Sequence, residues 1–276
     1  MLSLDQPGVA AITGASSGLG RAFALALARR GWALALSDVD QQGLDETRDL
    51  CAAAPGASGR FHTAIVDVRD VDAQTTWADE AEAQLGPATL VINNAGVAAT
   101  GEVGVLSPEL WDWVIDIDLK GVVWGCHVFV PRFRQRGAGH VINIASAAGF
   151  ANAPNMGCYN VSKAGVISLS QTLAAELAGT RVGVTVACPT FFRTNIGNNT
   201  RGAGPGERKL LDKLVNQSKI SPDTIAEAIL RGAQAGELHV IPQPDAKLFW
   251  ALRRTAPAQF SRLVHAATTF MRNRTH

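Results

Sequence analysis

Short apolar segments alternate with longer stretches of helical periodicity along most of the chain. The longer stretches, among them residues 20–31, 72–86 and 165–179, carry apolar residues at the spacing of an amphipathic helix. Most of the short segments are continuously apolar, which is typical of parallel strands covered on both faces. We therefore predict strands at seven runs, residues 9–13, 32–37, 61–66, 88–93, 140–145, 182–187 and 237–241.

This alternation predicts an α/β fold with one doubly wound parallel sheet and helices on both faces. No linker rich in proline or serine divides the chain, so we expect one domain over residues 1–244. Within it, residues 195–219 begin rich in glycine and asparagine and then turn helical, which favours a mobile lid over a substrate. Residues 245–276 are expected to form a helical extension that Pro257 breaks into two helices.

The first strand ends in a glycine-rich turn, TGASSGLG, which leads directly into a helix. Its glycines let the backbone approach a pyrophosphate, and the helix N-terminus supplies unpaired N–H groups and a favourable dipole. The turn therefore predicts a phosphate site of a dinucleotide, made by Gly14, Ser16, Ser17, Gly18, Leu19 and Gly20. The alternative is a glycine-rich turn between strand and helix that binds no ligand.

Acidic residues follow the next two strands. Asp38 can accept hydrogen bonds from both hydroxyls of an adenosine ribose and would repel a 2′-phosphate. Because no Arg or Lys follows Asp38 and Ser17 is uncharged, NAD is favoured over NADP; the alternative is a solvent-facing loop aspartate. Asp67, with Val68 beside it, is expected to reach the adenine amino group, and a helix N-cap is an equal alternative for Asp67.

Five motifs in order along the chain resemble those of the short-chain dehydrogenase/reductase family. They are the TGASSGLG turn, residues 93–96 (NNAG), Ser146, residues 159–163 (YNVSK) and the segment 189–194. The resemblance covers about residues 6–245 and implies a Rossmann-type domain with a seven-stranded parallel sheet. It also implies a nicotinamide cofactor, reversible hydride transfer at an alcohol or ketone, and a homodimer or homotetramer formed through two long helices, here about 107–134 and 157–178.

Transfer of hydride from an alcohol carbon needs a base that takes the hydroxyl proton. Tyr159 is the only tyrosine, and Lys163 lies four residues further on, on the same helix face. A nearby ammonium and an oxidised nicotinamide both lower the pKa of a phenol from about 10. By resemblance, Tyr159 is the acid/base, Lys163 tunes it and binds the nicotinamide ribose, and Ser146 orients the substrate. The alternative is a surface pair of Tyr159 and Lys163.

The resemblance assigns further residues to the cofactor. Asn94, Ala95 and Gly96 belong to its adenosine side, with a tight turn after a strand as the alternative. Pro189 and Thr194 flank the nicotinamide, and Thr194 binds its carboxamide. Phe192 is a further candidate for cofactor binding. Thr190 stands where the family usually has glycine, which restricts the backbone there.

Asp118 departs from the family pattern, which usually has asparagine at this position. In the family that asparagine holds a water that links the lysine to solvent and relays the proton. An aspartate keeps the shape and the acceptor but loses the amide donor. An ionised Asp118 would hold the ammonium more firmly and partly cancel its effect on Tyr159. We expect a working relay with altered pH dependence; the alternatives are much slower catalysis and cofactor binding without turnover.

Composition and charge narrow the classes of function. A chain of 276 residues with 47% apolar residues and a net charge of +1 is neither disordered nor basic enough to favour nucleic-acid binding. The four cysteines lie far apart, which supports neither a zinc site nor a disulfide framework, and we expect no metal. No run reaches the roughly 20 apolar residues of a membrane span, and no signal peptide is recognised, so we expect a cytoplasmic protein.

Apolar residues near the motifs favour a hydrophobic secondary alcohol or ketone as substrate. The candidate pocket residues are 98–101, 147–150, 152–156, Phe191, Phe192 and 195–219. In the extension, basic residues interleave with Trp and Phe, so peripheral contact with a membrane surface is one hypothesis. Packing on the lid or on a neighbouring subunit is favoured over it. The main prediction is an NAD-dependent oxidoreductase; the alternatives are an NADP-dependent carbonyl reductase and a cofactor-binding sensor.

Overall fold

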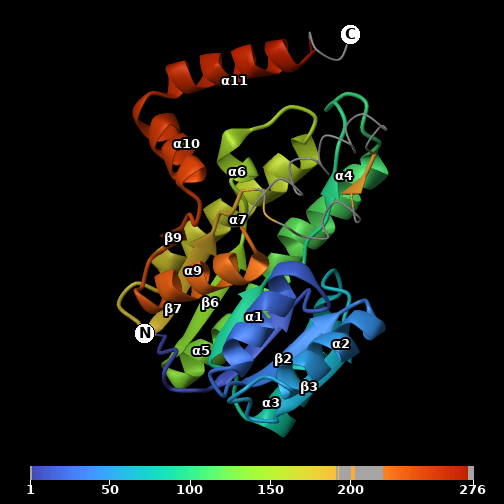
Figure 1. Cartoon of the computed structure of the whole chain (residues 1–276), viewed down its shortest axis with the longest axis vertical. Helices are drawn as coiled ribbons and strands as arrows, with labels where there is room; N and C mark the ends of the chain where they lie inside the picture. The colour runs from blue at the N-terminus through green and yellow to red at the C-terminus, as the bar shows by residue number, and fades with distance from the viewer. Residues whose placement is uncertain (1, 191, 193–199, 203–219, 273–276) are drawn as a thin grey trace.

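A parallel sheet of seven strands forms the centre of the computed structural model (Figure 1), which describes residues 2–190, 192, 200–202 and 220–272. The strand order is β3-β2-β1-β4-β6-β7-β9. The predicted strands are all present, the last one shortened to two residues. Their bounds are β1 Val9–Thr13, β2 Ala33–Asp38, β3 Phe61–Ile65, β4 Leu90–Asn93, β6 Gly139–Ile144, β7 Val182–Ala187 and β9 His239–Val240.

Helices cover both faces of the sheet, which explains the continuously apolar strands. In β1, Ala10 and Ile12 pack into the core beneath one layer of helices, and Val9 and Ala11 pack into the core on the opposite face. The first layer consists of α1 (Gly18–Ala28), α2 (Gln41–Ala52) and α9 (Pro222–Gln234). The second consists of α3 (Val71–Leu85), α5 (Gly121–Arg136) and α7 (Gly157–Glu176).

The sheet reverses its winding direction at β1. Strand β1 pairs with β2 on one side and with β4 on the other, so that Ala11 is opposite both Ala35 and Val91. The chain thus runs outward to β3 at the edge and then returns to the centre. In open α/β sheets, ligands bind outside the carboxyl ends of the strands at such a point.

The long helical region predicted at about 107–134 contains a π-helical turn. Helix α4 (Pro108–Ile115) is followed by the π-turn η1 (Asp116–Lys120) and then by α5 without a break. Such turns are rare in proteins as a whole, and those that occur are often found at functional sites. The buried Asp118 lies in η1, so the turn determines where that carboxylate points.

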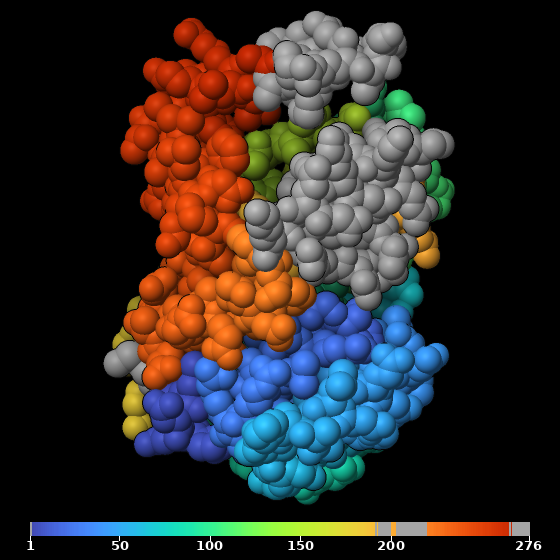
Figure 2. Space-filling model, viewed as in Figure 1, coloured from blue at the N-terminus to red at the C-terminus, as the bar shows by residue number. Residues whose placement is uncertain are grey.

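The carboxyl-end side of the sheet carries several smaller elements. Strand β5 (Ala98–Ala99) pairs with β8 (Thr200–Arg201), and the short helix α6 (Ala148–Ala151) follows β6. The extension forms α10 (Pro244–Thr255) and α11 (Pro257–Arg272), so Pro257 does separate two helices. Both helices are orange-red to red in Figures 1 and 2; in Figure 1, α10 lies at the upper left and α11 runs across the top. No helix in the described part of the chain has both the length and the hydropathy that a bilayer span requires.

Candidate active site

A cleft of about 760 Å³ opens at the carboxyl ends of the strands. It brings together most of the residues that the sequence assigns to a cofactor and to catalysis. Those in its lining are Gly14, Ser16, Ser17, Gly18, Leu19, Asp38, Asp67, Val68, Asn94, Ala95, Gly96, Ser146, Tyr159, Lys163, Pro189 and Phe192. Thr194 and Phe191 lie outside the described residues, as does most of the expected lid, 195–199 and 203–219.

The glycine-rich turn has a conformation that side chains would disturb. Gly14 has a φ of +66°, and a Cβ on it would lie 2.8 Å from the Cα of Ala95. Asn94 fixes the turn from the neighbouring strand, because its Nδ2 donates to the carbonyls of Thr13 at 2.9 Å and Gly14 at 3.0 Å. Helix α1 begins directly afterwards, and the side chain of its N-cap residue Ser17 makes no capping hydrogen bond. The first-turn N–H groups thus remain available to an anion in the cleft.

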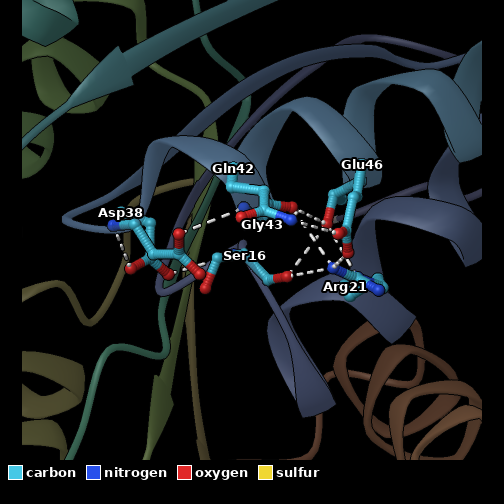
Figure 3. A network of polar contacts seen from close by, with 8 residues as sticks. Ser16, Arg21, Asp38, Gln42, Gly43 and Glu46 are labelled. Carbon is cyan, nitrogen blue, oxygen red and sulfur yellow. Dashed lines mark hydrogen bonds and ion pairs between the residues drawn. The ribbon is translucent and has the colours of Figure 1, made fainter.

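The Asp38 carboxylate is held at the edge of the cleft by backbone N–H groups (Figure 3). Its Oδ2 accepts a hydrogen bond from the Ser16 N–H at 3.0 Å, and its Oδ1 accepts one from Val39 N–H at 2.8 Å. The nearby guanidinium of Arg21 donates to the Ser16 carbonyl and pairs with Glu46 at 3.1 Å. The half-buried Asp38 side chain is therefore held by backbone N–H groups in the lining of the cleft.

Asp67 does not cap a helix. Asp70 is the N-cap of α3, and its side chain accepts hydrogen bonds from the N–H groups of Asp72 and Ala73. Asp67 instead pairs with Arg69 at 2.5 Å, and this side-chain hydrogen bond holds the pKa of Asp67 below its usual range although burial opposes it. Both members of the pair line the cleft, so Arg69 is a site residue that sequence reasoning missed.

Tyr159 and Lys163 lie together in the interior and not on the surface, which excludes the surface-pair alternative. Tyr159 is 8% exposed and Lys163 is 2% exposed, and the Lys163 Nζ lies 5.6 Å from the centre of the Tyr159 ring. Lys163 also donates to the Ile144 carbonyl at 3.1 Å. The Ser146 Oγ accepts from the Ala148 N–H at 3.1 Å and donates to the Pro189 carbonyl at 3.4 Å.

Asp118 lies behind these residues and is fully buried. Its Oδ1 accepts a hydrogen bond from the Val97 N–H at 2.7 Å, and its Oδ2 lies 3.2 Å from the Lys163 Nζ. Burial raises the pKa of Asp118. Burial by itself would lower the pKa of Lys163, but the charges of Asp118 and Tyr159 outweigh it and raise that pKa above its usual value. The pair therefore favours a charged Lys163.

The Tyr159 phenol is exposed to opposing influences. Burial raises its pKa most, the Lys163 charge lowers it, and the Asp118 charge raises it. The net result is a pKa above that of a free phenol. Asp118 thus acts on Tyr159 in the direction opposite to Lys163, as its negative charge requires.

The outer part of the cleft differs from the expected pocket. Phe150 is not part of the lining; it packs edge-on against Trp250 at 5.0 Å between ring centres. Ala98, Ala147, Ala148, Ala153 and Met156 are in the lining, as the sequence analysis expected. The lining also contains residues that no motif marks, because they come from separate elements that the fold brings together: Trp113, Ile117, Thr200, Arg201, Asp245 and Phe249.

Known proteins are similar to this chain in sequence and in fold. The family model for short chain dehydrogenases matches residues 8–203. The Mycobacterium tuberculosis protein EphD is 33% identical over 255 residues, which cover 89% of this chain but 43% of EphD, so the chain spans less than half of that relative.

Two solved structures are also similar. A short chain dehydrogenase/reductase from Burkholderia phymatum in complex with NAD superposes with a TM-score of 0.85 at 32% identity, over 92% of this chain and 95% of that one. A short-chain dehydrogenase from Sphingobium yanoikuyae in complex with NADPH has a TM-score of 0.74 at 28% identity, over 96% and 95%. The chain therefore belongs to the short-chain dehydrogenase/reductase family.

Proposed function

We propose that the protein is an NAD-dependent oxidoreductase that interconverts an apolar secondary alcohol and its ketone, with Tyr159 as the acid/base. The observation that carries the proposal is the meeting of Tyr159, Lys163 and Ser146 in the same cleft as the glycine-rich turn and Asp38. The candidate phosphate-binding turn and the proposed proton-transfer group thus line one cleft. This is the arrangement that hydride transfer to a dinucleotide needs.

The residues of the cleft fit such a cofactor. The turn at Gly14 and the uncapped start of α1 suit a pyrophosphate, and Asp38 suits the adenosine ribose. A bound nicotinamide supplies the hydride acceptor or donor. Lys163 lines the same cleft, where its ammonium could also bind the second ribose.

Tyr159 carries the proton in this proposal. In alcohol oxidation its phenolate takes the hydroxyl proton, and in ketone reduction its phenol returns it. Lys163 stabilises the phenolate by its charge. The Ser146 hydroxyl, which donates to the Pro189 carbonyl in this structure, would turn to donate to the substrate oxygen.

Asp118 is proposed as a positioning residue for Lys163. Its Oδ1 is fixed by the Val97 N–H, which leaves Oδ2 directed at the ammonium. Its charge raises the pKa of Tyr159. Among the influences that raise this pKa, only burial is larger. We therefore propose a working proton relay with altered pH dependence, in preference to slowed or lost catalysis.

NAD is proposed over NADP because the Asp38 carboxylate would repel a 2′-phosphate. Arg69 lines the cleft and is paired with Asp67, and the Arg21 guanidinium beside Ser16 is paired with Glu46. The alternative, an NADP-dependent carbonyl reductase, requires that one of these charges rearrange.

We propose a homodimer or homotetramer through α4, α5 and α7, since Val161 of α7 is 51% exposed and offers an apolar contact. Light scattering coupled to size exclusion measures the oligomeric state, and a monomer would contradict that part of the proposal.

All four cysteines are buried free thiols, which fits the proposed cytoplasmic, reducing setting.

The function is tested by titrating the protein with NAD and NADP and then measuring turnover with secondary alcohols. We expect tighter binding of NAD and a loss of kcat of about 10²- to 10⁴-fold in Tyr159→Phe with unchanged affinity for NAD. Activity that survives in Tyr159→Phe would contradict the assigned base. Tight binding of NAD without turnover on any alcohol would favour the sensor alternative.

A further inference from the structure

We propose that helix α10 of the C-terminal extension forms a wall of the substrate cleft and that Phe249 selects substrates with an aromatic or similarly bulky apolar substituent. The inference rests on the proposed alcohol–ketone function and adds a substrate class to it. Phe249 lines the cleft together with Asp245, one helical turn before it. Neither residue belongs to a motif of the sequence.

Helix α10 is attached firmly to the body of the protein. The Trp250 ring packs against Phe150 at 5.0 Å and against the His239 ring at 5.2 Å between ring centres. Arg253 donates a hydrogen bond to the Phe150 carbonyl, one turn from Trp250. Three contacts from one face of α10 therefore hold it against α6 and β9, and Figure 1 shows α10 beside α6.

These contacts place α10 on the substrate side of the cleft. Helix α6 begins two residues after Ser146, the proposed substrate-orienting residue. At the start of α10, the N-cap Gln243 accepts a hydrogen bond from the Thr190 N–H at 3.1 Å. Thr190 follows Pro189, whose carbonyl accepts the Ser146 hydroxyl. The helix is thus tied at both ends to segments near Ser146.

Phe249 offers an apolar ring that a ligand can cover. It is 43% exposed, although large aromatic side chains are stabilised by burial. Its ring packs edge-on against Phe260 of α11 at 6.3 Å, and Phe260 is only 5% exposed. Helix α11 thereby contacts the Phe249 ring. Trp113 and Met156 extend the apolar lining of the same cleft.

The test compares two methyl ketones that share the reacting end and differ by a phenyl group, butan-2-one and 4-phenylbutan-2-one. Their affinities for the full-length protein are measured by calorimetry with and without saturating NAD, and their kcat/KM values with NADH. The variants are Phe249→Ala and the control Leu248→Ala, which removes a neighbouring side chain that is 67% exposed and outside the cleft lining. Phe249→Leu serves as a second variant if Phe249→Ala loosens the extension.

We expect wild-type protein and Leu248→Ala to prefer 4-phenylbutan-2-one over butan-2-one. In Phe249→Ala the ratio of the affinities for the two ketones, and that of their kcat/KM values, should fall about tenfold. Phe249→Leu should retain part of it. An equal ratio in Phe249→Ala and Leu248→Ala, or no preference in the wild type, would overturn the inference. Failure of NAD to bind would count against the proposed function only. A ratio of the two ketone affinities that depends on Phe249 in the absence of NAD would still support the role of α10.

Discussion

The Lys163 Nζ atom lies 3.2 Å from the Asp118 Oδ2 in the interior of the protein, where both side chains are shielded from water. A buried charge that loses its partner is destabilising, so each member of this pair needs the other. The pair couples the residue that departs from the family pattern to the proposed proton-transfer site. We therefore expect the Asp118 charge to influence the pH dependence of catalysis.

Asp118→Asn should move the rising limb of alcohol oxidation to lower pH. The oxidation step needs the Tyr159 phenolate, so its rate rises with pH until the phenol is deprotonated. The Asp118 charge raises the pKa of Tyr159, and its removal lowers that pKa. A pH–rate profile of kcat for the wild type and the variant measures the displacement.

The matched control is Asp116→Asn, in the same π-turn. Asp116 pairs with Lys120 at 2.7 Å near the surface, where solvent screens the charge. Its profile should coincide with that of the wild type. An unmoved limb in Asp118→Asn, or equal displacements in the two variants, would count against a specific effect of the Asp118 charge.

Asp38→Asn should narrow the preference for NAD over NADP by about tenfold or more. The substitution keeps an acceptor for the Ser16 N–H but removes the negative charge that would repel a 2′-phosphate. Fluorescence titration with both reduced cofactors measures the ratio of dissociation constants. Asp45→Asn, a carboxylate of α2 paired with Arg48, should leave the ratio unchanged. A preference for NADP in the wild type would mean that the role of Asp38 was misjudged.

Gly14→Ala should weaken NAD binding at least tenfold and lower the free energy of unfolding by more than Gly59→Ala does. Both glycines have a positive φ, +66° and +69°, so each alanine carries a strain of about 1–2 kcal/mol. A Cβ at residue 59 would meet nothing within 4 Å, whereas one at residue 14 would collide with Ala95. Urea unfolding and NAD titration of both variants separate strain from collision. Equal losses would show that the close approach to Ala95 is unimportant.

The buried His140 should make the fold sensitive to acid. Its Nε2 lies 3.0 Å from the Thr185 hydroxyl, which donates to the Glu237 carbonyl, so Nε2–H donates to that hydroxyl. Burial lowers the pKa of His140 to about 4, from 6.5. Between these values the unfolded chain binds a proton that the folded protein does not, and stability is lost as pH falls, by up to about 3 kcal/mol. Urea unfolding measures the free energy of unfolding at pH 7 and at pH 4.5. The loss of this free energy between the two pH values should be smaller in His140→Asn than in the wild type. Equal losses in the two proteins would contradict this role of His140.

The chemistry-bearing residues were accessible to sequence reasoning because they are local in the chain. The turn at residues 13–20, Asp38 and the pair Tyr159–Lys163 each consist of a few residues next to a strand end or on one helix face, and the structure places them in one cleft. The helix-cap role allowed for Asp67 was wrong because Asp70, three residues later, begins α3. Two acidic residues this close cannot be ranked as caps from their residue type alone.

The apolar periodicity by itself determined the parallel sheet, its two helical layers and the strand ends where a cofactor would bind. Strand and helix patterns depend on neighbouring residues, and burial on both faces leaves a continuous apolar signal. Only the tertiary structure decided that Asp118 faces Lys163 through a π-turn and that Phe249 reaches the cleft from α10. These contacts join residues that are 45 or more positions apart, and their direction depends on how whole helices pack, which no local pattern records.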